Sequence, residues 1–220
     1  LYLVMIASSF RIRFIFCIAA LLLAEPVHAR VTYFDMSETE NTNLAPFPKW
    51  TGMMERYNEQ QMIPDEECNK NHFHPCSIHS WRDLLKRTAG MNFSDKLTTI
   101  NDWGNAHPYI VDQLNWGIND FWATPYEFME VNGDCEDYSI AKYYTLRAAG
   151  VPSNRLRIMI VQDMNLGGII HAVLGVYDEQ GTLWVLDNQI RQVRTAFSIY
   201  HYIPIYGVNE DKWWRYLPNS

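Results

Sequence analysis

The clearest periodic pattern in the chain covers residues 134–149. Apolar side chains recur there at the spacing of one helix face: Tyr138, Ala141, Tyr144 and Ala148. Asp134 is a suitable N-cap, Asp137 forms a capping-box-like pair with it, and Gly150 marks the end of the pattern. The pattern therefore predicts a helix whose first turn contains Cys135.

Three stretches rich in apolar and β-branched residues follow this helix. They are "LRIMIVQDM" (156–164), "IIHAVLGVYD" (169–178) and "TLWVLDNQI" (182–190), and "DEQG" forms a turn between the last two. They predict an antiparallel sheet.

The part of the chain before residue 134 has mainly helical patterns. Residues 30–65 are expected to be extended, with one helix near 50–61, and residues 79–100 predict two helices, the second capped by Ser94. A short helix is expected between the aromatic segments "NDWGNAHPYI" and "LNWGINDFWATP". N-terminal helices followed by an antiparallel sheet make an α+β fold.

Residues 1–29 have the features of a secretory signal peptide. Arg11 and Arg13 precede an apolar run over residues 14–24, and a small-x-small pattern ends at Ala29. A membrane anchor is the alternative, but the run is much shorter than the roughly 20 residues that a spanning helix needs. We expect export, cleavage after about Ala29, a mature domain of residues 30–220, and no membrane insertion after cleavage.

Composition and charge exclude several classes of protein. The chain is 48% hydrophobic with eight Trp and 13 Tyr, which is typical of a folded domain. Its net charge of −7 becomes −8 when the signal peptide removes Arg11, Arg13 and Glu25. Nucleic-acid and anionic-membrane binding depend on cationic surfaces, so neither is expected.

Three cysteines follow residue 29: Cys68, Cys76 and Cys135. Cys68 and Cys76 bracket the polar loop "NKNHFHP", which a disulfide would close, leaving Cys135 free. A zinc site that also uses His72, His74 and His79 is the alternative, but the spacing C-x3-H-x-H-x-C-x2-H matches no common zinc pattern. The sequence favours the disulfide.

Cys135 has two candidate partners on the predicted hairpin, His171 and Asp187. A loop over Tyr177–Gly181 would place position 171 directly opposite 187, as a cysteine–histidine–aspartate triad needs. Each residue alone could have a purely structural role: Cys135 as an inert thiol, His171 as a core histidine, and Asp187 as an aspartate that starts a turn. A cysteine that opens a helix, followed by this pair, favours nucleophilic catalysis.

The segment "WATPYEFMEVNGDCEDYSIAKYYTLRAAGV", followed by "HAVLGVY" and "LWVLDN", resembles the bacterial transglutaminase-like cysteine proteinases, specifically the LapG-type periplasmic proteases. The resemblance runs from about Trp81 to the C-terminus and does not extend over residues 30–80. It implies a transglutaminase-like (papain-like) fold in which Cys135 is the nucleophile, His171 the base and Asp187 its orienting acid.

The resemblance also implies a biological setting. Members of this family act in the periplasm and cleave a large repeat adhesin near its N-terminus, usually at paired alanines, which releases the adhesin and disperses biofilm. An inner-membrane receptor that senses cyclic di-GMP holds the protease away from its substrate when this messenger is abundant. We expect these two partners here.

Calcium is the cofactor that the resemblance implies, bound by acidic residues beside the cysteine. Asp134, Glu136 and Asp137 would repel one another and the thiolate, and a cation that prefers oxygen ligands would cancel that repulsion. The alternative is that acids are simply favourable in the first turn of a helix.

Two other functions remain open at this stage. The same fold can form a catalytically inactive, calcium-stabilised binding module, or a transglutaminase or amidase. The set of Cys135, His171 and Asp187 argues against the inactive module. Isopeptide formation with an added amine would separate a transglutaminase from a protease.

Overall fold

Seven antiparallel strands form one sheet within residues 36–62 and 75–218, the part of the chain that the computed structural model describes. The spatial order of the strands is β1-β7-β6-β2-β3-β4-β5. Their bounds are β1 Met36–Asn41, β2 Leu156–Asp163, β3 Ile169–Tyr177, β4 Leu183–Leu186, β5 Arg194–Thr195, β6 Tyr202–Val208 and β7 Trp213–Pro218. Strand β2 lies at the centre, between β6 and β3.

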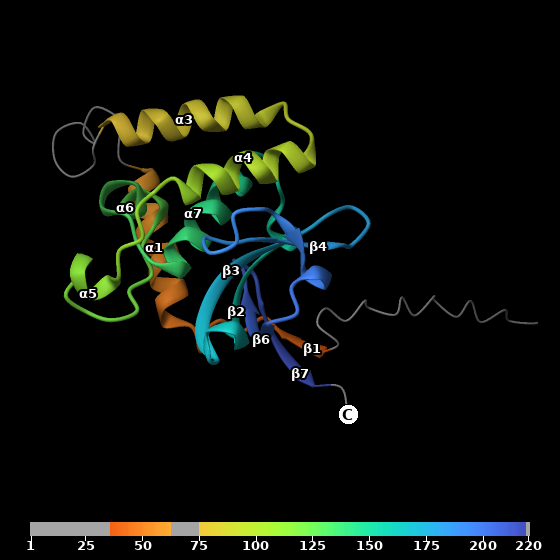
Figure 1. Ribbon diagram of the computed structural model, residues 1–220. Coiled ribbons are helices and arrows are strands. Elements are labelled where there is room, and N and C mark those ends of the chain that lie inside the picture. The colour runs from red at the N-terminus through yellow and green to blue at the C-terminus, as the bar shows by residue number, and fades with distance from the viewer. Residues whose placement is uncertain (1–35, 63–74, 219–220) are drawn as a thin grey trace, which may run out of the picture. The chain divides into compact units, whose positions relative to one another are not determined.

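The helices precede most of the sheet in sequence. They are α1 Pro48–Gln61, α3 Pro75–Ala89, α4 Phe93–Asn105, α5 Asp112–Asn115, α6 Pro125–Val131 and α7 Cys135–Ala148. Short 3-10 helices are η2 Ser153–Arg155, η3 Met164–Leu166 and η4 Ala196–Ser198. Figure 1 shows α7 between α4 and the sheet, with α3 beyond α4. The predicted α+β fold is confirmed.

Helix α7 is buried over nearly its whole circumference. Every residue from 136 to 146 is buried, polar ones included, because α4 and α6 cover one side and β2 and β3 cover the other. The apolar core on this side of the sheet joins Ile140, Tyr143 and Leu146 of α7 to Ile158 and Leu174. Close packing on both sides makes α7 a rigid support for Cys135.

Most of the predicted elements are confirmed, and one predicted cap is wrong. The helix near 50–61, the two helices over 79–100, the helix from 134 and the three strands are all present. Helix α4 begins at Phe93, and its cap is Asn92 rather than Ser94, because the Asn92 side chain accepts the Asp95 N–H at 2.9 Å. Strands β1, β5, β6 and β7 and helix α6 were not predicted.

The predicted register between β3 and β4 is wrong by two residues. Leu174 pairs with Leu186 and Tyr177 with Leu183, so the loop lies one residue later in the chain than predicted and has the same length. Asp178 tightens it, because its Oδ1 accepts the N–H groups of Gln180 and Thr182. Position 171 therefore does not lie opposite 187. A shift of two residues keeps the same side chains on the same face of the sheet.

Some predictions lie outside the described residues. These are the signal peptide over residues 1–29, and the predicted disulfide with its zinc alternative, since Cys68, His72 and His74 and the side chains of Cys76 and His79 are not described. They stay predictions. In the described part of the chain, no helix combines the length and the apolar character that membrane spanning requires.

Trp50 joins α1 to the core, and its truncation tests that packing. The side chain is fully buried, lies edge-on to Tyr143 at 5.7 Å between ring centroids, and donates Nε1–H to the Asn209 carbonyl at 2.9 Å. Trp50→Ala should lower the free energy of unfolding by about 4 kcal/mol in urea titrations. Met62→Ala, at an exposed side chain, should change it by less than about 0.5 kcal/mol. Equal effects would contradict this packing.

Candidate active site

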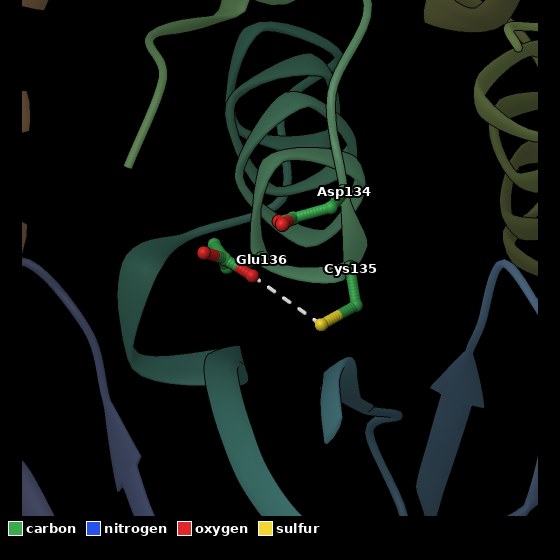
Figure 2. Close-up of side chains that lie close together, drawn as sticks. All are labelled: Asp134, Cys135 and Glu136. Carbon is green, nitrogen blue, oxygen red and sulfur yellow. Dashed lines mark hydrogen bonds between the residues drawn. The ribbon is translucent and has the colours of Figure 1, made fainter. Parts of the chain in front are cut away.

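Cys135 begins helix α7 and is half-buried, with its thiol toward the sheet. Figure 2 shows Asp134, Cys135 and Glu136 projecting from this turn, with the Cys135 Sγ joined to a Glu136 carboxylate oxygen at 3.3 Å. The first turn of a helix also offers unpaired N–H groups and a positive dipole end. Both features favour negative charge on the sulfur.

His171 and Asp187 form a buried hydrogen-bonded pair. His171 Nε2 lies 2.9 Å from Asp187 Oδ1, and both side chains are almost fully buried. The two residues are diagonal neighbours on one face of the sheet, which explains why they meet although the register differs from the predicted one. The structure thus brings together two of the three residues predicted for the triad.

Asp187 is held by further donors. Its Oδ2 accepts the Tyr202 hydroxyl at 2.5 Å, and its Oδ1 also accepts the Gln189 backbone N–H at 2.8 Å. Burial raises the pKa of Asp187. The hydrogen bond and charge of His171, and the hydrogen bonds from Tyr202 and Gln189, outweigh burial and leave this pKa below its ordinary value. Asp187 is therefore an ionised acceptor at neutral pH.

The contacts of the imidazole define its tautomer. Since Nε2 faces a carboxylate, it carries the proton, and Nδ1 is left as the acceptor. The side-chain amide nitrogen of Gln189 lies 3.3 Å from Nδ1, which agrees with an unprotonated Nδ1. This nitrogen is the one that can accept a proton from a thiol.

A cleft of about 730 Å³ contains both Cys135 and His171 in its walls. The backbone N–H of Ala172, the residue after His171, is near enough to the Cys135 sulfur to lower the pKa of the thiol. The thiol thus lies against the same stretch of β3 that carries the imidazole. Other walls come from residues 46–50 and from Tyr109, Asp120, Trp122, Ile160, Ile170 and Tyr206.

The surroundings of Cys135 disfavour a thiolate unless a positive charge is added. Burial raises the pKa of the Cys135 thiol, the Glu136 and Asp134 carboxylates raise it further, and the Ala172 N–H lowers it. The thiol donates to Glu136, which stabilises the protonated form. A cation bound to the carboxylates would cancel the repulsion that Glu136 and Asp134 exert on a thiolate.

Two overlapping groups of acidic side chains lie beside the thiol. Within each group the candidate ligand atoms are all less than 4.8 Å apart: one joins Asp112, Asp134 and Asp137, and the other joins Asp134, Cys135 and Glu136. Burial, then neighbouring carboxylates, raise the pKa of Glu136 to about 10 and that of Asp137 well above its ordinary value. Burial and Asp134 likewise raise the pKa of Asp112 to about 6.

The carboxylate oxygens suit a divalent cation. Asp112 Oδ1 and Asp134 Oδ1 are buried, and neither has a hydrogen-bond partner among the described residues. An unpaired buried oxygen is costly, and a cation that prefers oxygen ligands would satisfy both atoms and neutralise the cluster. The predicted ligands Asp134 and Asp137 lie in the first group with Asp112, while Glu136 lies beside the thiol.

Sequence reasoning missed Asp112, Gln189 and Tyr202. Asp112 is 22 residues before Asp134, and only the fold brings it close. Tyr202 opens a strand that was not predicted, so its hydroxyl could not be placed against Asp187. Gln189 sits within the predicted strand segment 182–190, and its position two residues after Asp187 was the available signal.

The sequence of the chain matches one family over most of its length. The model of the bacterial transglutaminase-like cysteine proteinases matches residues 64–220. The chain belongs to this family of cysteine proteinases. The match includes Cys135, His171, Asp187 and the acidic cluster, and leaves α1, β1 and the cleft wall from residues 46–50 outside.

Solved structures of Legionella pneumophila LapG are similar to this proteinase. The calcium-bound form is 28% identical with a TM-score of 0.61, and the similarity covers 70% of this chain and 88% of that one. An EGTA-treated form is 27% identical with the same TM-score, covering 69% and 82%. No curated protein sequence matches this chain significantly.

The raised carboxyl pKa values predict how stability depends on pH in protein stripped of metal by a chelator. Asp112 and Glu136 hold protons in the folded state at pH values where they ionise in the unfolded chain, so the folded state binds more protons. Stability should therefore fall as pH rises from about 5 to about 7, measured as a lower Tm. Asp112→Asn should reduce this slope. A Tm that rises over the same interval would contradict the assignment.

Proposed function

We propose that this proteinase is a calcium-dependent periplasmic cysteine endopeptidase that cleaves the N-terminal region of a large surface adhesin. Cys135 is the nucleophile, His171 the general base and Asp187 the acid that orients it. The supporting observation is the hydrogen bond between His171 and Asp187 in the cleft that also contains Cys135 at the start of α7.

Proton transfer follows from the tautomer of His171. With Nε2–H bonded to Asp187, Nδ1 accepts the thiol proton as the sulfur attacks the carbonyl carbon of the scissile peptide bond. Backbone N–H groups in the first turn of α7 stabilise the oxyanion. His171 then donates the proton to the leaving amine, and water hydrolyses the thioester.

We propose that Asp112, Asp134 and Asp137 bind calcium. Glu136 lies beside the thiol, to which its carboxyl group is hydrogen-bonded. A cation there would neutralise the carboxylates that hold the Cys135 pKa high. Support comes from the two unpaired buried oxygens and from the similarity to LapG solved in a calcium-bound form. Because Asp137 also bonds two backbone N–H groups, its geometry is fixed before any ion binds.

The adhesin substrate and its regulation rest on the family resemblance. The cleft has apolar and aromatic side chains in its walls, which suit an extended peptide. An inner-membrane receptor that senses cyclic di-GMP would control access to this cleft. Cleavage would release the adhesin and disperse the biofilm.

Alkylation of Cys135 tests the catalytic assignment. With saturating calcium, iodoacetamide should label the wild type with an apparent pKa below that of an ordinary thiol, about 8.5, and His171→Ala should move it to about that value or above. His107→Gln is the control, because the His107 ring bonds the Trp103 carbonyl and does not line the cleft that contains Cys135. An ordinary thiol pKa in both the wild type and His171→Ala would reject the assignment.

Cleavage of a purified adhesin N-terminal fragment tests the role of calcium. A calcium-selective chelator should abolish cleavage without unfolding the domain, calcium should restore it, and magnesium should not, because it demands a tighter octahedral site. Asp112→Asn should need a higher calcium concentration for half-maximal cleavage.

The control for that experiment is Asp83→Asn, which alters an exposed carboxylate on α3 paired with Lys86. It should leave the calcium requirement unchanged. Full cleavage in the chelator would contradict the proposed cofactor. An isopeptide product with an added amine would instead indicate a transglutaminase.

A further inference from the structure

Lys142 is a fully buried lysine on α7, two turns after Cys135. Only 1% of it is exposed, and burial lowers the pKa of its amine to about 7. A lysine is seldom buried so completely, because removing its charge from water is costly unless the amine is fully hydrogen-bonded. Its polar contacts therefore indicate what the residue does.

The amine of Lys142 is bonded to two asparagines of α4. Nζ lies 2.8 Å from Asn101 Oδ1 and 2.7 Å from Asn105 Oδ1. Gly104 leaves space for the lysine stem, since a Cβ there would lie 2.6 Å from Lys142 Cε. A neutral amine still has two N–H donors, so both bonds persist in either protonation state.

The nitrogen end of each asparagine amide holds the segment 187–191. Asn105 Nδ2 donates to the Asp187 carbonyl at 2.8 Å, and Asn101 Nδ2 donates to the Arg191 carbonyl at 2.9 Å. This segment follows β4 and has no regular secondary structure. Both ends of the segment that carries Asp187 and Gln189 are thus tied to α4.

The lysine decides which way each amide points. The oxygen and the NH2 group of an asparagine are similar in size, so either could face a neighbour. Lys142 offers only N–H donors to these two amides, which draws both oxygens toward it. The NH2 groups are then left for the carbonyls of residues 187 and 191. An amide turned the other way would present oxygen to carbonyl oxygen.

We propose that Lys142 is a positioning residue for the active site. It fixes the orientation of Asn101 and Asn105, and through them it holds the backbone of residues 187–191 so that the Asp187 carboxylate stays on His171. The proposal rests on the function proposed above, since it assigns a role to residues behind the same triad. Lys142 touches neither substrate nor the reacting atoms.

The test replaces the amine and measures the His171–Asp187 bond directly. Lys142→Met keeps an unbranched side chain, one atom shorter, and removes the amine and its hydrogen bonds to both asparagines. The low-field proton NMR signal of the His171 Nε2–H should move upfield or broaden. With saturating calcium, alkylation of Cys135 by iodoacetamide should slow by about tenfold to a hundredfold. An unchanged signal and an unchanged rate would overturn the proposal.

A matched control separates positioning from general destabilisation. Thr145 lies on α7, is buried, and accepts the Trp81 Nε1–H at 2.9 Å, with no bond to residues 187–191. Thr145→Val should lower the Tm but leave the NMR signal and the alkylation rate unchanged. If Thr145→Val shifted both as strongly as Lys142→Met, the effect of the lysine would be structural and the proposal would fail.

A double-mutant cycle tests the route through Asn105. Asn105→Ala should reproduce most of the loss, and the double variant with Lys142→Met should be no slower than the slower single variant. Losses that multiply would overturn the route. If Lys142→Met does not fold, Asn105→Ala and Asn101→Ala still decide the outcome through the same two measurements.

The variant His171→Ala distinguishes a failure of the proposed catalytic set from a failure of the role of Lys142. If it leaves alkylation unchanged, the proposed catalytic set fails. If His171→Ala slows alkylation while Lys142→Met and Asn105→Ala do not, only the role of Lys142 fails.

Discussion

The carboxylate of Asp137 fixes the start of helix α7, and the geometry of the site depends on it. Its Oδ1 accepts the Ala123 N–H at 2.7 Å, and its Oδ2 accepts the Asp134 N–H at 3.1 Å. The side chain is fully buried, and the space it occupies requires glycine at position 133, where a Cβ would lie 2.2 Å from Asp137 Oδ2. The direction in which the chain enters α7, and hence the position of Cys135, follows from these contacts.

The same carboxylate creates an electrostatic problem beside the thiol. Asp137 and Asp134 raise the pKa of the buried Glu136, and Glu136 and Asp134 in turn raise the pKa of the Cys135 thiol beyond the effect of its burial, so the acidic groups together disfavour a thiolate. Helix rigidity and thiol reactivity therefore impose opposite demands on one turn of the chain. A bound cation would meet both demands, because it would neutralise the carboxylates while the hydrogen bonds of Asp137 hold the start of the helix.

Periodicity was sufficient to predict the helix that carries Cys135 and the three strands around His171, because these segments are long and bounded by clear turn and cap residues. The pairing of His171 with Asp187 was predicted through the wrong register. The prediction that the two side chains meet still holds, because a register error of two residues leaves both side chains on the same face of the sheet. An error of one residue would have placed the two side chains on opposite faces.

Other parts of the fold and site could not be predicted, for physical reasons. Strand β5 has two residues, and β1 is mostly exposed and polar, so neither has an apolar signature. Asp112 reaches the cluster only through tertiary contacts. Lys142, in a helix with apolar neighbours, has the sequence pattern of a solvent-facing lysine, and its burial depends on two asparagines 37 and 41 residues away. Side chains that act through distant loops leave no local pattern.

The site is supported from two directions. Cys135 is fixed by the first turn of α7, and Asp187 is fixed from the side of α4 by Asn105 as well as by the hydroxyl of Tyr202. The cleft wall formed by Pro46, Phe47 and Lys49 lies outside the segment that matches the family, whereas the proposed chemistry lies entirely within it. Because those three residues make no hydrogen bond to Cys135, His171 or Asp187 among the described contacts, the wall that meets a substrate can vary while the reacting groups stay in place.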